Sequence, residues 1–106
     1  NPAIRKAYKN VETVAEEKLL HMLPEEFQPT YAPILHPDEK TEQLVKAADK
    51  LSAYIKCVEE LKAGNNEFRE AAAQTRAALE GYGLPEVAYF LETFLPSFSL
   101  TLDELK

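Results

Sequence analysis

The sequence contains little of what most small catalytic motifs require. Of its 106 residues, only three are glycine, one is cysteine and none is tryptophan. Phosphate-binding loops and dinucleotide fingerprints need several glycines at fixed spacing, so these motifs are excluded. The single cysteine, Cys57, excludes an internal disulfide framework and a zinc site built from several cysteines. This cysteine content is typical of an intracellular protein, and we expect a cytoplasmic location.

Positive charge is also scarce. Twelve lysines and arginines against eighteen aspartates and glutamates leave a net charge of −6. Because nucleic-acid backbones attract basic surfaces, this balance argues against nucleic acid as the main partner. It remains compatible with a small phosphorylated ligand held at one local site. No apolar run approaches the roughly eighteen residues that a membrane span requires, so we expect no membrane partner.

What the sequence does contain is apolar residues at helical spacing, three and four positions apart. The pattern predicts an all-α fold with four main helices, at about residues 1–23, 38–63, 67–80 and 85–95. Asn1 is a good N-cap for the first helix, and Asn66 is the N-cap expected for the third. Residues 24–37 carry four prolines, so we expect a loop with isolated helical turns there.

The longest predicted helix carries one acidic residue of interest. Its buried stripe is expected to be Leu44, Ala48, Leu51, Ile55 and Val58. Asp49 is expected at the edge of this stripe, beside Val45 and Ser52. A carboxylate there either points into a groove and offers an oxygen to a cation, or is solvated and neutralised by Lys46 or Lys50. The residues alone favour the solvated arrangement.

The remaining candidates for chemistry are weaker. Cys57 lies within a helix without an identifiable histidine base, which is typical of a small, half-buried side chain. His21 lies near the end of the first helix, where a cation interacts favourably with the helix dipole. His36 and Asp38 form too small a ligand set for a metal site, and we expect His36 to be a plain loop residue. The residues alone therefore define no complete active site and no catalytic residue.

Two internal stretches and the C-terminal tail resemble a known enzyme family. They are LVKAADKLSAYIKC at 44–57, EELKAGNNEF at 59–68 and PSFSLTLDE at 96–104. They resemble the C-terminal half of YfbR-like 5′-deoxynucleotidases, metal-dependent phosphohydrolases of the HD superfamily. The similarity covers nearly all of the chain, and the run AGNNEF is quite specific. It implies that residues 1–106 are the C-terminal part of a single helical HD-type domain.

The resemblance implies a function for Asp49. In the family, a histidine, an adjacent His-Asp pair and a later aspartate on a long helix hold one divalent metal. Asp49, in its Ala-Ala-Asp-Lys-Leu setting, matches that last aspartate. The implied reaction is hydrolysis of deoxynucleoside 5′-monophosphates to deoxynucleoside and phosphate. The implied cofactor is cobalt, manganese or a similar divalent ion, and the implied assembly is a homodimer.

The chain departs from the family pattern in one respect. It contains no His-Asp dipeptide, and His21 and His36 match none of the family's ligands. The resemblance places the other ligands upstream of Asn1, so we expect residues 1–106 to be inactive alone. The alternative is a non-catalytic helical module that mediates interaction or dimerisation. The two differ in whether the reading frame upstream of Asn1 encodes a histidine and, later, a His-Asp pair.

Overall fold

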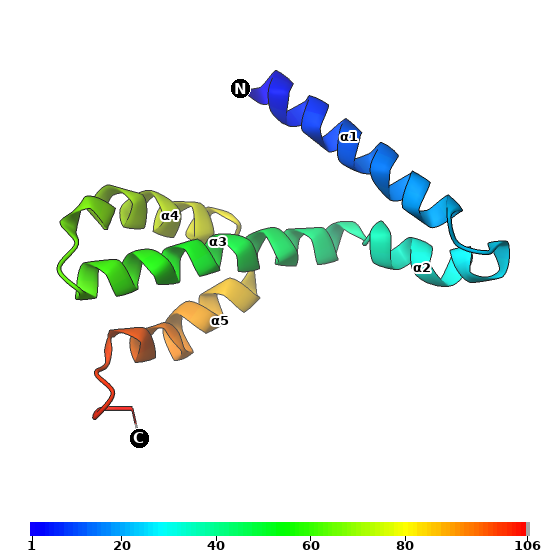
Figure 1. The fold of residues 1–106 in the computed structure, drawn as a ribbon. Helices are drawn as coiled ribbons and strands as arrows, with labels where there is room; N and C mark the ends of the chain where they lie inside the picture. The colour runs from blue at the N-terminus through cyan, green and yellow to red at the C-terminus, as the bar shows by residue number, and fades with distance from the viewer. Residues whose placement is uncertain (106) are drawn as a thin grey trace. The chain divides into compact units, whose positions relative to one another are not determined.

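A computed structural model of the protein describes residues 1–105, and every regular element in that range is a helix (Figure 1). The all-α prediction is therefore confirmed for these residues. The α-helices are α1 (Pro2–His21), α2 (Gln28–Leu35), α3 (Glu39–Lys62), α4 (Arg69–Gly81) and α5 (Pro85–Thr93). The short 3-10 helices are η1 (Glu25–Phe27), η2 (Asn66–Phe68) and η3 (Leu95–Ser99). Within residues 1–105, none of these helices is long and apolar enough to cross a membrane.

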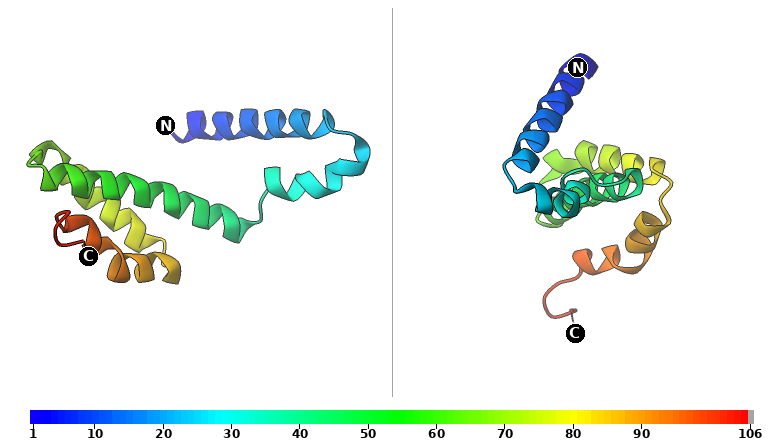
Figure 2. Two further views of the ribbon diagram at one scale, coloured as in Figure 1. Left: turned by 60° about the horizontal axis from the view of Figure 1, so that its bottom comes forward. Right: turned by 90° about the vertical axis from the view of Figure 1, so that its right-hand side faces the viewer.

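The chain divides into two compact units, and the boundary in the sequence lies between Glu42 and Gln43. The first unit consists of α1, η1, α2 and the first residues of α3, and the chain reverses direction between α1 and α2 (Figure 2). Asn1 caps α1 as expected, because its side chain accepts a hydrogen bond from the Ala3 amide at 2.9 Å. No residue of this unit is buried.

The four predicted helices are present as α1, α3, α4 and α5, but the region expected to be a proline-rich loop forms a further, two-turn helix. Pro29 lies in the first turn of α2, where a proline lacks only an amide that has no helical partner. Pro33 lies inside α2 and removes a single backbone hydrogen bond. The eight-residue helix forms without that hydrogen bond, and the His36 amide still donates to the Ala32 carbonyl at 2.8 Å.

The second unit has a hydrophobic core. α3, α4, α5 and η3 each contribute to it, and α4 and α5 lie along α3 (Figure 1). Leu79 of α4 is fully buried, with 0% of its surface exposed. The buried members of the cluster are Ala47, Leu79, Val87, Leu91 and Leu95, and the partly buried side chains against it are Leu51, Tyr54, Ile55, Val58, Leu84 and Phe98.

The buried stripe of α3 differs from the prediction at one position. Ala47 is 3% exposed, whereas Ala48, which is expected in the stripe, is exposed. Leu51, Ile55 and Val58 pack against the core as predicted. The apolar spacing is compatible with either alanine, and the positions of α4 and α5 decide between them. Burial of Ala47 in place of Ala48 moves the centre of the stripe further from Asp49.

The turn between α3 and α4 depends on two residues of the run AGNNEF. Gly64 follows the end of α3 and has a φ of +91°, a conformation that a side chain would strain. The Asn65 side chain accepts a hydrogen bond from the Glu67 amide at 3.3 Å. The cap is therefore Asn65 rather than Asn66, because η2 precedes α4 and moves the start of the helical segment.

The C-terminal tail is fixed at two points. The Thr101 amide donates to Glu104 Oε2 at 2.7 Å, which is one of the hydrogen bonds of a capping box. This hydrogen bond holds the pKa of Glu104 below its usual value. Further back, Lys62 Nζ donates to the Leu100 carbonyl. The tail is therefore tied to the end of α3 as well as to itself.

Candidate functional site

Asp49 lies on the face of α3 that points away from the core. It is two positions from both Ala47 and Leu51, and each residue turns an α-helix by about 100°. Asp49 therefore lies about 160° around the helix from each of them. The expected place at the edge of the apolar stripe is wrong, because Asp49 lies on the far side of the helix from the core residues Ala47 and Leu51.

The surface around Asp49 is not covered by the second unit. Val45, one turn before it, is 60% exposed although it is apolar. Ser52 and Ala53, about one turn after it, are also exposed. The packed side of α3 is the opposite one, where Ala47 meets residues of α4 and α5. α3 thus presents an accessible carboxylate among small and apolar side chains.

No cation of the described chain neutralises Asp49 directly. Within residues 1–105, Asp49 forms no ion pair with Lys46 or Lys50, which the solvated alternative had named as partners. The next lysine along this side, Lys56, is engaged elsewhere. Its Nζ lies 2.5 Å from Glu60 Oε1, and this contact raises the pKa of Lys56 and lowers that of Glu60. The Asp49 oxygens are therefore available to an outside partner.

A complete metal site is not present in the described residues. A catalytic divalent ion is usually held by about three protein ligands with one open position. Residues 1–105 contain no group of three or more histidine, cysteine, aspartate or glutamate side chains arranged to hold an ion. Asp49 by itself has the chemistry of a single oxygen donor. The described chain alone does not fit a bound metal.

The two histidines lie away from Asp49 in the sequence and have local partners. His21 Nδ1 lies 2.7 Å from the Glu17 carbonyl oxygen of its own helix, near the C-terminal end of α1 as predicted. His36 caps the end of α2 and contacts Glu16 of α1, with Nδ1 3.0 Å from Oε2. It does not share a ligand with Asp38, whose Oδ1 accepts from the Thr41 amide at 2.7 Å. His36 is thus a helix-end residue with a partner rather than a plain loop histidine.

Cys57 does not provide a nucleophile. Its side chain is 5% exposed, which is more buried than the sequence pattern suggests. It has no disulfide partner, in agreement with the single cysteine of the sequence. A thiol needs access and a nearby base or cation to react, so this one is structural.

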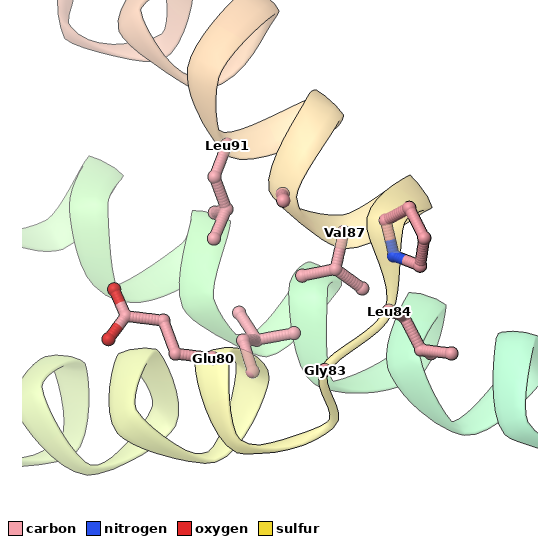
Figure 3. Close-up of a pocket in the computed structure, with 8 residues that line it drawn as sticks. Glu80, Gly83, Leu84, Val87 and Leu91 are labelled. Carbon is pink, nitrogen blue, oxygen red and sulfur yellow. The ribbon is translucent and has the colours of Figure 1, made fainter.

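A cavity of about 340 Å³ lies at the turn between α4 and α5 (Figure 3). Leu79, Val87 and Leu91 contribute apolar side chains to its wall. The only ionisable group in the wall is Glu80, whose Oε1 accepts a hydrogen bond from Arg76 Nε at 2.7 Å. This pair raises the pKa of Arg76 and occupies the carboxylate. The cavity therefore offers apolar surface but no free acid or base, and the sequence pattern gave no sign of it.

Comparison with known proteins defines the class. A family model described as YfbR-like 5′-deoxynucleotidase matches residues 1–98. The chain therefore belongs to the YfbR-like 5′-deoxynucleotidase family. It is 54% identical to a 5′-deoxynucleotidase of Photobacterium profundum and 52% identical to one of Vibrio parahaemolyticus, each over 108 aligned residues. Identity to the 5′-deoxynucleotidase YfbR of Escherichia coli is 49% over 109 aligned residues.

These alignments cover different fractions of this chain and of each relative. Each includes 99% of this chain but only 54–56% of the relative. The chain thus spans about half the length of the curated relatives it matches.

Proposed function

We propose that the chain is the part of a metal-dependent 5′-deoxynucleotidase that supplies one metal ligand, Asp49. The substrate would be a deoxynucleoside 5′-monophosphate, and the products a deoxynucleoside and phosphate. Family membership supports the reaction class. The observation that carries the role of Asp49 is its position: an exposed carboxylate without an ion-pair partner among residues 1–105, on the uncovered face of α3. The proposed metal is cobalt, manganese or a similar divalent ion.

The proposal includes the HD-type fold and the inactivity of this chain by itself. A catalytic site with one protein ligand in place of about three cannot hold and orient an ion. We therefore expect no release of phosphate from dAMP or dUMP by the purified chain with Co²⁺ or Mn²⁺ added. A measurable turnover under these conditions would show that the chain needs no further ligands.

The test of Asp49 is complementation. The part of the E. coli relative that lies outside the alignment is produced together with this chain, and phosphate release from dAMP is measured. We expect activity with the wild-type chain and a loss of at least about a hundredfold with Asp49→Asn, because a lost ligand also lowers metal content. Glu59→Gln is the matched control, since Glu59 is another exposed carboxylate of α3.

Two outcomes would contradict the proposal. Equal activity and equal metal content in the Asp49→Asn and wild-type complexes would remove Asp49 from the site. Failure of the two parts to form an active complex is resolved by an asparagine substitution in the intact E. coli enzyme, at the residue that aligns with Asp49. If turnover and metal content survive there, the proposed ligand is wrong.

We also propose that the chain associates into a homodimer. α1 exposes a continuous apolar stripe, in which Tyr8 is 69% exposed, Val11 is 66% exposed and Met22 is 79% exposed. Such a surface favours association by about 25 cal/mol for each Å² removed from water. Size-exclusion chromatography with light scattering is expected to give twice the mass of the chain. A single peak at 12.0 kDa at high concentration would contradict the proposal.

A non-catalytic interaction module is the second candidate, and the exposed stripe of α1 favours it. The two candidates predict different upstream sequences, since only the enzyme requires a histidine and a His-Asp pair before Asn1. A cytoplasmic location is part of either proposal and is supported by the free thiol of Cys57.

A further inference from the structure

A recess lies beside α3 in the second unit, one helical turn from Asp49. It has a volume of about 230 Å³ and is lined by Gln43, Lys46, Tyr82 and Leu84. The first two residues belong to α3, and the other two belong to the turn between α4 and α5. All four lie within the second unit, so the packing of that unit alone forms the recess.

The turn that supplies one wall of the recess is held in place by its own backbone. The Tyr82 amide donates to the Leu79 carbonyl at 3.3 Å, and the Gly83 amide donates to the Glu80 carbonyl at 3.2 Å. Leu84 packs against the core cluster, whereas Tyr82 keeps 40% of its surface exposed. The recess therefore combines a fixed apolar side chain with an accessible aromatic ring.

The polar groups of the recess are complementary to a nucleotide. No acidic side chain lines it, and within residues 1–105 the Lys46 ammonium group forms no ion pair with Glu42 or Asp49, which lie about one turn away on α3. An ammonium group binds phosphate, and an aromatic ring stacks on a base. The Gln43 amide offers both a donor and an acceptor, as a base edge requires.

Lys46 lies between the recess and Asp49. Residues three positions apart on an α-helix are neighbours, separated by about 60° around the axis and about 4.5 Å along it. Gln43, Lys46 and Asp49 follow one another at this spacing and form a row that leads out of the recess. A whole small ligand usually needs roughly 300 Å³ or more, so this recess has room for one end of a nucleotide.

We propose that the recess binds the base of a deoxynucleoside 5′-monophosphate and that Lys46 binds its phosphate. The base stacks on the ring of Tyr82, and its polar edge pairs with the Gln43 amide. The phosphate then lies over Lys46, on the side towards Asp49. The choice of a nucleotide as the ligand rests on the proposed function.

NMR titration of the whole chain with dAMP, without added metal, tests the recess. We expect saturable shifts of the amides of residues 43–46 and 82–84 at millimolar concentrations, with the amides of α1 as the internal reference. Deoxyadenosine and inorganic phosphate should each bind more weakly than dAMP, because each lacks one half of the contacts. The absence of saturable shifts up to about 20 mM dAMP would overturn the proposal. Equal affinity for dAMP and inorganic phosphate would also overturn it, because the recess would then hold only an anion.

A charge variant and a matched control test the phosphate contact. Lys46→Gln should raise the dissociation constant for dAMP about three- to fivefold and leave that for deoxyadenosine unchanged. Lys56→Gln removes the same charge from α3 and should change neither, because Lys56 pairs with Glu60 and does not line the recess. Equal weakening of dAMP binding by the two variants would overturn the role of Lys46.

Variants of Tyr82 test the stacking contact. Tyr82→Leu should raise the dissociation constants for dAMP and deoxyadenosine by at least about fivefold, because it removes the ring. Tyr82→Phe keeps the ring and should remain within about twofold of the wild type. Equal effects of the two substitutions would overturn the stacking of the base on this residue.

Asp49→Asn separates this proposal from the proposed metal ligand. It should not weaken dAMP binding to the metal-free chain, because Asp49 does not line the recess. Loss of dAMP binding in this variant would overturn the assignment of the binding site to the recess. Retained binding, together with unchanged activity and metal content in the complementation test, would support the recess and contradict only the role of Asp49.

Discussion

The two units of the chain contain the same kind of element and stabilise it in different ways. In residues 1–42 no side chain is fully buried. The helices are held by half-buried apolar side chains such as Leu20 and Leu35, together with caps, a carbonyl tie and one ion pair. From Gln43 onward, a cluster around the fully buried Leu79 packs three helices together. Apolar residues at helical spacing therefore predict a helix, but they do not predict whether another part of the same chain covers its apolar face.

The largest expected effect comes from separating the units. A peptide of residues 1–37 should lose most of its helical signal, because helices without a buried face are marginal in water. A peptide of residues 38–106 should keep a cooperative unfolding transition. Circular dichroism with thermal and urea unfolding checks both. A cooperative transition in the first peptide, or none in the second, would show that the contrast between the units is wrong.

A single leucine in each unit sharpens the contrast. Leu79→Ala should destabilise the second unit by about 3 kcal/mol, because it leaves a cavity in a core with no other fully buried large side chain. Leu19 of α1 is 55% exposed, so Leu19→Ala is the matched control and should cost below about 0.5 kcal/mol. Urea midpoints of the whole chain measure both. Equal costs would mean that Leu19 is covered in solution.

A smaller effect is expected at the turn between α3 and α4. Asn65→Ala should cost about 1 kcal/mol, because it removes the acceptor for the Glu67 amide and the donor to Glu60. Asn66→Ala is the control, since its side chain only accepts from Arg69 at an exposed site, at 3.3 Å. The same urea measurement compares them. A larger loss for Asn66→Ala would return the cap to the residue that the sequence pattern favours.

The smallest effect is a pH dependence at the start of α3. The hydrogen bond from the Thr41 amide holds the pKa of Asp38 below its usual value. Its stabilising contribution is therefore present above the ordinary carboxyl pKa and is lost as the pH falls through the lowered pKa. Amide protection in the first turn of α3 should drop in acid in the wild type and less in Asp38→Asn. An equal drop in both would exclude Asp38 as the cause.

Much of the fold follows from local chemistry in the sequence. Asn1 followed by Pro2 predicts the start of α1, and Gly64 predicts the end of α3, because each acts through its own backbone and its nearest neighbours. Four prolines predict a loop at residues 24–37, whereas Pro33 costs the two-turn helix α2 only one backbone hydrogen bond. A rule based on proline alone fails here because the free-energy cost of an internal proline depends on how long the helix is.

The candidate site was less predictable. Its one residue, Asp49, came from the resemblance, since helical spacing placed it at the edge of the buried stripe rather than opposite it. Which alanine of the pair Ala47 and Ala48 is buried depends on where α4 and α5 pack, and periodicity does not contain that information. One carboxylate does not define a metal site, so the set of metal ligands stays a proposal.

The hydrogen bond from Lys62 Nζ to the Leu100 carbonyl affects how easily a protease can remove the C-terminal residues. It connects positions 38 residues apart and so closes the segment that contains α4 and α5. A protease must release several residues before it can cleave, and this tie keeps the backbone around Leu100 from peeling away. Beyond it, Leu102 is 89% exposed. Trimming should therefore stop short of Leu100 and leave the packed helices intact.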